Sequence, residues 1–160
     1  MFEIEKLNNS DYEQFTNMFL DYFINDLGVE QDENLLRENL VKNFILKQYA
    51  KGLIFIDVIK EQNQCLGFNI YQIDSENADW SERIGWGFIR EIYVAKSHRK
   101  FGLGTKLLSH AENVLKNLGV TEVYLTSDEN DYVKKFYLKN GYKTDNVKAK
   151  NGLDYYEKKL

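Results

Sequence analysis

The segment from residue 84 to residue 126 contains a strand pattern, a helix pattern and a second strand pattern, and this order constrains the fold more than any other feature. Residues 85–94 alternate between two faces, and residues 122–126 are rich in β-formers. Between them, apolar residues recur at helical spacing over residues 103–118. Two strands joined by such a helix lie parallel in one sheet with a right-handed crossover. The segment therefore predicts an α/β fold.

The remaining elements fit one mixed α/β domain. The patterns predict, in chain order, a strand at 2–7, helices at 10–27 and 32–48, strands at 53–59 and 65–73 joined as a hairpin, a short helix that ends at Asn140-Gly141, and two strands around Asn151-Gly152. The sequence shows no internal repeat, low-complexity segment or linker. We therefore expect a single domain over residues 1–160.

Composition limits the classes of function. With 160 residues, 43% of them apolar, the chain can bury a core without a metal or a disulfide. Its one cysteine, Cys65, cannot form an internal bridge, and two scattered histidines do not indicate a metal site. The net charge of −4 argues against general nucleic-acid binding. No leader pattern or run of about 18 apolar residues is present. These features predict a cytoplasmic protein with no metal.

A basic loop with two glycines precedes the long helix. It reads Arg99-Lys100-Phe101-Gly102-Leu103-Gly104-Thr105. Glycines at this spacing let the backbone approach a bulky anion, and the free N–H groups of a helix start favour phosphate. The dinucleotide fingerprint is absent, because Leu107 occupies its third glycine position, and there is no Gly-Lys-Ser/Thr. We predict phosphate binding here; the alternative is an ordinary glycine turn before a helix.

A carboxylate interrupts the apolar strand before this loop. Glu91 shares one face of the strand with Ile89 and Tyr93. Desolvation raises the pKa of a carboxyl group toward that of a useful general base. Glu91 is therefore a candidate base; the alternative is that it pairs with Arg90, Lys96 or another base on the sheet.

Two residues near the last helix could face one cleft. Asn130 and Tyr137 are seven residues apart, which is two helical turns. A tyrosine with a pKa of about 10 can serve as a general acid. The alternative for Tyr137, one of 11 tyrosines, is a core ring with a hydroxyl that reaches water.

An acidic segment lies between the hairpin and the central strand. Residues 74–82 contain no base and four acids: Asp74, Glu76, Asp79 and Glu82. With Trp80 and Trp86 nearby, the segment suggests contact with a cationic ligand. The alternatives are a solvated loop and two packing tryptophans.

Together these stretches resemble the GNAT superfamily of acetyl-CoA-dependent N-acetyltransferases. Residues 99–104 match that family's Arg/Gln-x-x-Gly-x-Gly/Ala motif, and residues 91–94 resemble the strand before it. Asn130, Phe136-Tyr137 and Gly141-Tyr142 resemble the family's later asparagine and helix end. The resemblance is specific over residues 88–142. It implies a single-domain α/β GNAT fold, with a mixed central sheet of about six or seven strands, splayed between the fourth and fifth and flanked by helices.

The resemblance also implies how acetyl-CoA would be bound as a co-substrate. The backbone of the fourth strand would hold the pantetheine arm, through Ile92, Tyr93 and Val94. The pyrophosphate would be held by the side chains of Arg99 and Lys100 and by a run of backbone amides. These amides belong to Phe101, Gly102, Leu103, Gly104 and Thr105. Asn130 would bind further along the cofactor, and no metal takes part.

The reaction that follows is direct transfer of the acetyl group to an amine. The amine is protonated around neutral pH, because its pKa is about 10, and it must lose a proton before it attacks the thioester. Glu91, alone or through water, would remove that proton. A backbone N–H on the fourth strand would stabilise the tetrahedral intermediate. Tyr137 would protonate the departing thiolate, a step uphill by about 2 kcal/mol for unperturbed groups.

Three functions are compatible with these residues. The first is N-acetylation of a small cationic amine, the second is acetylation of a protein or peptide amine, and the third is acetyl-CoA binding without catalysis. The expected partners are a small-molecule or peptide amine, without nucleic acid or membrane, and a homodimer is the assembly considered.

Overall fold

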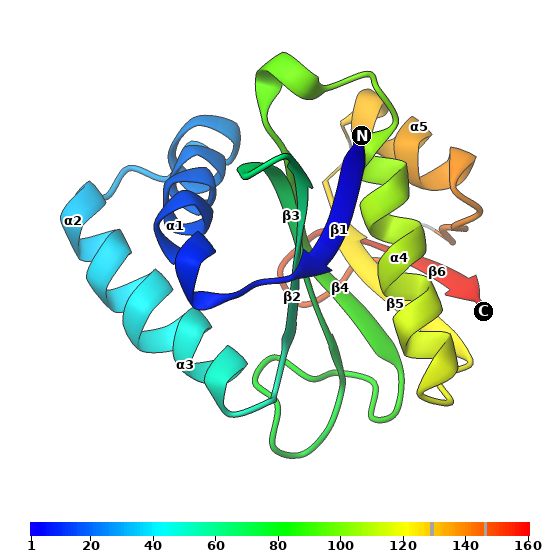
Figure 1. The fold of residues 1–160 in the computed structure, drawn as a ribbon. Coiled ribbons are helices and arrows are strands. Elements are labelled where there is room, and N and C mark those ends of the chain that lie inside the picture. Colours follow the sequence, from blue (N-terminus) through cyan, green and yellow to red (C-terminus); the bar gives the residue numbers. More distant parts are fainter. Residues whose placement is uncertain (129, 146) are drawn as a thin grey trace. The chain divides into compact units, whose positions relative to one another are not determined.

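The computed structural model describes residues 1–128, 130–145 and 147–160 (Figure 1). The strands are β1 (Phe2–Lys6), β2 (Phe55–Glu61), β3 (Gln64–Ile73), β4 (Gly87–Val94), β5 (Glu122–Ser127) and β6 (Asp154–Lys159). The helices are α1 (Tyr12–Asp21), α2 (Glu33–Leu35), α3 (Leu46–Ala50), α4 (Leu103–Asn117) and α5 (Asp131–Lys139). A π-helical turn, Tyr22–Asp26, follows α1, and a π-helical segment, Leu36–Ile45, joins α2 to α3.

The strands form one mixed sheet in the order β1-β2-β3-β4-β5-β6. β1 pairs antiparallel with β2, and β5 pairs antiparallel with β6. β4 and β5 are parallel, as the helical crossover between them predicts. Among the described residues their register partners are Gly87 with Val123 and Phe88 with Tyr124, so the later residues of β4 have no partner in β5. The predicted α/β sheet, which opens between its fourth and fifth strands, is confirmed.

The residues group into two compact units. The first unit contains residues 1–70 and 91–111, and the second contains residues 71–90 and 112–160. β3, β4 and α4 each contribute to both units. A single domain over residues 1–160 stays a prediction.

An aromatic core covers one face of the strands in the first unit. Phe15 and Phe19 of α1 are buried against Phe68 of β3 and Tyr93 of β4. The ring centroids of Phe19 and Phe68 lie 5.8 Å apart, and those of Phe68 and Tyr93 lie 5.5 Å apart. Phe15 and Phe19 of α1 are therefore core residues.

The first half of α4 covers the other face of the same unit. Leu103 and Leu107 are buried there, and Ile92 and Val94 of β4 pack against them. Figure 1 shows α1–α3 on one side of β1–β3 and the start of α4 on the other. The alternation of β4 therefore directs Tyr93 to the aromatic core, and Ile92 and Val94 to α4.

The second unit is built around tyrosines. Tyr124 of β5 stacks on Phe88 of β4, with 4.7 Å between ring centroids. Tyr137 of α5 contacts Tyr142 and Tyr156, with centroids 5.8 Å and 5.6 Å away. These rings fix α5 against the end of the chain.

Three elements differ from their predictions. The helix predicted over residues 32–48 is π-helical over Leu36–Ile45. The helix predicted over residues 10–27 ends in a π-helical turn, where the N–H of Leu27 donates to the carbonyl oxygen of Tyr22 at 2.9 Å. Of the two strands predicted around Asn151-Gly152, one is β6, and the other is reduced among the described residues to bridges such as Lys148 with Asp154. In the described residues, no helix has the length and apolar character needed to cross a membrane.

Candidate functional site

The end of β4 approaches β3 closely because β3 carries a glycine there. A Cβ atom at Gly67 would lie 2.5 Å from the carbonyl oxygen of Tyr93 and 3.3 Å from the Cα of Val94. The N–H of Ala95 donates to the carbonyl oxygen of Leu66 at 2.8 Å and fixes the register. Gly67 therefore sets the position of the backbone that is predicted to contact pantetheine. Composition and spacing gave no signal for this glycine.

The loop after β4 turns into α4 at an open glycine. Lys100 and Gly102 have φ values of 70° and 76°, and a Cβ atom at Gly102 would meet nothing within 4 Å. The N–H of Lys106 donates to the carbonyl oxygen of Gly102 at 3.1 Å and closes the first turn of α4. The N–H groups of residues 103–105 therefore precede the helical hydrogen bonds. Backbone donors and the positive end of a 15-residue helix meet beside open space, which fits a phosphate group.

The side chain of Arg99 ties this loop to the π-helical turn. Its Nη2 lies 2.7 Å from Oδ2 of Asp26, and its Nε donates to the carbonyl oxygen of Val94 at 2.7 Å. Its guanidinium carbon lies 5.6 Å from the ring centroid of Tyr93. Arg99 thus holds together the end of β4 and the segment after α1. Its contact with pyrophosphate stays a prediction, in which the phosphate would share the guanidinium with Asp26.

Glu91 accepts a hydrogen bond from the hydroxyl of Tyr22, in the π-helical turn. In the reverse direction, the hydroxyl of Tyr93 donates to Asp21, the residue before Tyr22. Hydrogen bonds from Tyr93 and Asn25 lower the pKa of Asp21, whereas burial and then the bond to Asp21 raise the pKa of Tyr93. Around neutral pH, Asp21 is therefore ionised and Tyr93 keeps its proton. Tyr22 is a partner of Glu91 that the sequence did not indicate.

The second unit contains the other two predicted site residues. Asn130 caps α5: its Oδ1 accepts from the N–H of Tyr132 at 2.9 Å and from that of Val133 at 3.4 Å. The Nδ2 group is the part of this side chain that could donate to a ligand. Tyr137 is buried in the tyrosine cluster of α5. Glu91 and residues 92–105 belong to the first unit. The predicted site residues of β4 and of the loop after it therefore lie in one unit, and Asn130 and Tyr137 lie in the other.

The acidic segment is organised by a buried carboxylate. Oδ2 of Asp74 accepts from the N–H groups of Glu82 and Arg83 at 2.9 Å and 3.0 Å, and from the hydroxyl of Tyr124 at 2.5 Å. Oδ1 of Asp74 accepts from Nε2 of Gln72 at 2.9 Å. Asp74 is therefore a structural residue of the loop, not a solvated acid.

Both tryptophans beside this segment already face an arginine of the chain. The guanidinium carbon of Arg90 lies 4.4 Å from the ring centroid of Trp80, and that of Arg83 lies 4.8 Å from the ring centroid of Trp86. Arg83 also pairs with Glu157 at 2.6 Å. One face of each ring is therefore occupied by a cation of the protein itself, and a cationic ligand at this segment stays a prediction.

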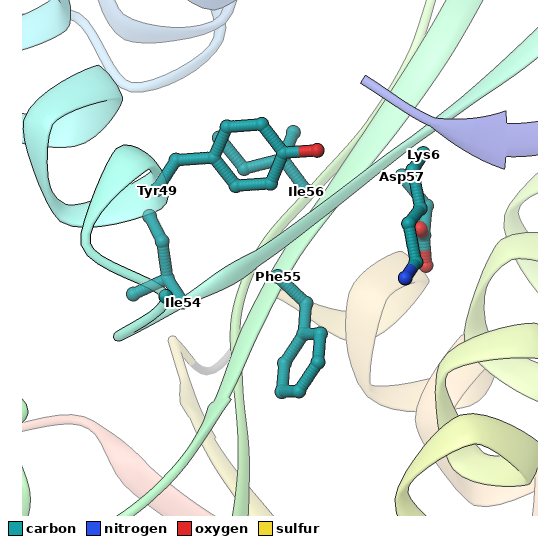
Figure 2. Close-up of a pocket in the computed structure, with 7 residues that line it drawn as sticks. Lys6, Tyr49, Ile54, Phe55, Ile56 and Asp57 are labelled. Atoms are coloured by element: carbon teal, nitrogen blue, oxygen red, sulfur yellow. The ribbon is translucent and has the colours of Figure 1, made fainter. Parts of the chain in front are cut away.

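A hollow in the first unit lies outside the predicted site. Its lining includes Lys6, Tyr49, Phe55 and Asp57, and its volume of about 270 Å³ is below the ~300–1,000 Å³ of typical ligand pockets. Figure 2 shows Lys6 and Asp57 side by side, as expected for register partners on β1 and β2. None of its lining residues is a predicted site residue. Among the described residues, no group of three His, Cys, Asp or Glu could hold a metal ion.

Comparison with known families gives one clear assignment. The family model described as "Acetyltransferase (GNAT) family" matches residues 12–142. No curated protein matches the chain.

Solved structures share the fold at low sequence identity. A PaiA N-acetyltransferase from Thermoplasma acidophilum, in complex with coenzyme A, is 20% identical with a TM-score of 0.77, and the match covers 100% of this chain and 99% of that one. The ribosomal-protein-alanine N-acetyltransferase from Brucella melitensis is 17% identical with a TM-score of 0.74, and 99% of each chain is covered. The yncA protein from Salmonella typhimurium, with its cofactor acetyl-CoA, is 18% identical with a TM-score of 0.71, covering 100% of this chain and 93% of that one.

Proposed function

This chain belongs to the acetyltransferase (GNAT) family, and we propose that it transfers an acetyl group from acetyl-CoA to a primary amine. The observation that carries the proposal is the backbone of β4 and the loop after it. β4 has no partner in β5 beyond Phe88 among the described residues, and it leads into the open glycine at the start of α4. Two of the similar structures contain coenzyme A or acetyl-CoA, which supports the choice of co-substrate.

The residues present fit this co-substrate. The amides of residues 103–105, beside open space at Gly102, would donate to the pyrophosphate. Lys100 and the exposed Phe101 lie on the same loop, and Arg99 would add its charge. The backbone of Ile92, Tyr93 and Val94, positioned by Gly67, would hold the pantetheine arm. Asn130 would contribute its amide group.

The chemistry needs a base, an oxyanion donor and an acid. Acetyl-CoA supplies an activated acetyl thioester. Glu91 would accept the proton of the attacking amine, and a backbone N–H of β4 would stabilise the oxyanion of the tetrahedral intermediate. Tyr137 would donate a proton to the departing sulfur. The acid and base are thereby assigned to different elements, β4 and α5.

The acceptor is a primary amine of one of two kinds. A small cationic amine is the first candidate; its pKa of about 10 requires a base, the role proposed for Glu91, and a lysine side chain has the same requirement. A protein or peptide amine is the alternative. It is supported by the similar structure from Brucella melitensis, which is a ribosomal-protein-alanine N-acetyltransferase. The arginine-covered rings of Trp80 and Trp86 favour neither.

The first test is binding and turnover. Calorimetry with acetyl-CoA should show binding, and release of free thiol should follow addition of an amine from a panel of small amines and peptides. Binding with no turnover on any amine would instead support a non-catalytic acetyl-CoA module. Absence of acetyl-CoA binding would overturn the whole proposal.

The second test concerns the assigned acid. Tyr137→Phe keeps the ring contacts with Tyr142 and Tyr156 and removes only the hydroxyl. We expect acetyl-CoA affinity to be retained while kcat falls about 10²-fold or more. Turnover that is unchanged at every pH would remove Tyr137 from the chemistry.

A further inference from the structure

Two adjacent residues of the π-helical turn and its lead-in exchange hydrogen bonds with two residues on one face of β4. Tyr22 donates to Glu91, and Tyr93 donates to Asp21. Each pair joins a phenol to a carboxylate, and the two pairs run in opposite directions between helix and strand. We propose that Tyr22 is a positioning residue for Glu91, which fixes the carboxylate and favours its ionised form. This inference rests on the proposed role of Glu91 as the base.

The ring of Tyr22 is held by aromatic neighbours from its own turn and from α1, β3 and β4. Its centroid lies 6.4 Å from that of Phe19, 5.8 Å from Phe23, 6.2 Å from Phe68 and 6.1 Å from Tyr93. All four contacts are edge-on, with interplanar angles of 63–84°, a geometry that aromatic pairs favour. A hydroxyl on a ring held in this way has a fixed place, so the carboxylate that accepts from it is fixed as well.

The π-helical turn begins at Tyr22, directly after Asp21. The bond from the N–H of Leu27 to the carbonyl oxygen of Tyr22 spans five residues, so the turn is wider than an α-helical one. π-helical turns occur frequently at functional sites. Asp26, at the end of the same turn, pairs with Arg99 at 2.7 Å and fixes the turn to the loop after β4.

The consequence for Glu91 has a definite sign. A hydrogen bond donated to a carboxylate stabilises its charged form, so Tyr22 favours the deprotonated Glu91 that a base requires. The neighbouring pair of Asp21 and Tyr93 is surrounded by further charged groups, namely Lys96, Arg99 and Asp26. A change confined to the hydroxyl of Tyr22 leaves all of them in place.

The test uses Tyr22→Phe, with Tyr49→Phe as a matched control. Tyr49 belongs to the same unit and donates its hydroxyl hydrogen to the carbonyl oxygen of Leu7 at 2.7 Å, so its variant also loses one phenol hydrogen bond. In a profile of kcat/KM against pH, the acid limb of Tyr22→Phe should move up by about one pH unit. The limb of Tyr49→Phe should stay where it is in the parent protein.

Two further measurements separate positioning from a structural role. In the Glu91→Gln background, Tyr22→Phe should lower kcat/KM no further, because its partner is already altered. NMR titration of labelled glutamate carboxyl carbons should show a higher pKa for Glu91 in Tyr22→Phe, and this readout needs no turnover. An unmoved carboxyl titration and an unmoved acid limb would overturn the proposal. If the parent protein transfers no acetyl group, the proposed function fails, while the titration still decides whether Tyr22 acts on Glu91.

Discussion

Replacing Gly67 with alanine should displace the part of β4 on which acetyl-CoA binding depends. The new Cβ atom would lie 2.5 Å from the carbonyl oxygen of Tyr93, whereas real Cβ atoms essentially never approach another atom within 3.0 Å. The neighbour is backbone, and the Cα of Val94 at 3.3 Å and Cγ2 of Ile59 at 3.3 Å limit other movements. The end of β4 must therefore shift by roughly half an ångström or more.

Two effects of known size follow from this shift. Overpacking of a buried strand costs about 1–3 kcal/mol, and for a chain of this length a loss of about 2 kcal/mol lowers Tm by about 4–8 °C. A displacement of 1 Å can cost about 10²-fold in rate, so half of that should lower kcat/KM for acetyl-CoA by about tenfold.

The assay combines thermal unfolding with acetyl-CoA titration and steady-state kinetics. Gly52→Ala is the control, because a Cβ atom at Gly52 meets nothing within 4 Å, so the added methyl group causes no clash; its φ of 73° supplies a loss of stability of a different origin. It should lose stability from backbone strain and keep its acetyl-CoA affinity. If Gly67→Ala binds acetyl-CoA as tightly as the parent protein, the close approach of β3 and β4 does not position the cofactor site, and the reasoning is refuted.

Two other substitutions and one labelling experiment have expected outcomes. Gly102→Asp should abolish acetyl-CoA binding in calorimetry without unfolding the protein, because it places a negative charge at the predicted phosphate site. Gly152→Asp is the matched control, at φ 82° in open space, and should keep the acetyl-CoA affinity of the parent protein. Asp74→Asn should destabilise the protein by about 3 kcal/mol in denaturant unfolding, since a buried acceptor of four hydrogen bonds loses one of its two oxygens. Glu76→Gln, at an exposed position, should change the free energy of unfolding little. Burial raises the pKa of Cys65 to about 11, so iodoacetamide at pH 8 should label it only after unfolding.

Labelling of native Cys65 at the rate of a free thiol would contradict its burial. Equal losses of acetyl-CoA affinity in Gly102→Asp and Gly152→Asp would point to a general effect of charge and remove Gly102 from the site. Unchanged stability in Asp74→Asn would show that the acidic segment is held together by other contacts.

Periodicity predicted the elements because it is a local property. The stripe over residues 103–118 and the alternation over 85–94 were enough to place α4 and β4 and to make the crossover parallel. The open geometry of Gly102 likewise agrees with a motif that lies within seven residues. In each case the information is contained in neighbouring positions, and neighbouring positions are what a sequence displays.

The acidic segment shows what composition alone does not decide. Four acids without a base suggested either solvation or a cationic ligand. Three of them are exposed, whereas the buried Asp74 is the acceptor for backbone N–H groups of its own loop. Arg83 and Arg90, which follow the segment, occupy the faces of Trp86 and Trp80. Charge counts along a chain do not show which residues meet when it folds.

The sequence by itself determined the order of elements, the faces of β4 and the glycine loop before α4. Only the tertiary structure decided which side chains meet across elements: Gly67 with the carbonyl oxygen of Tyr93, and Tyr22 with Glu91. These contacts join residues 26 and 69 positions apart, and they depend on strand register and on a π-helical turn. A shift of one residue in either would turn every side chain involved to another direction, so no local pattern contains them.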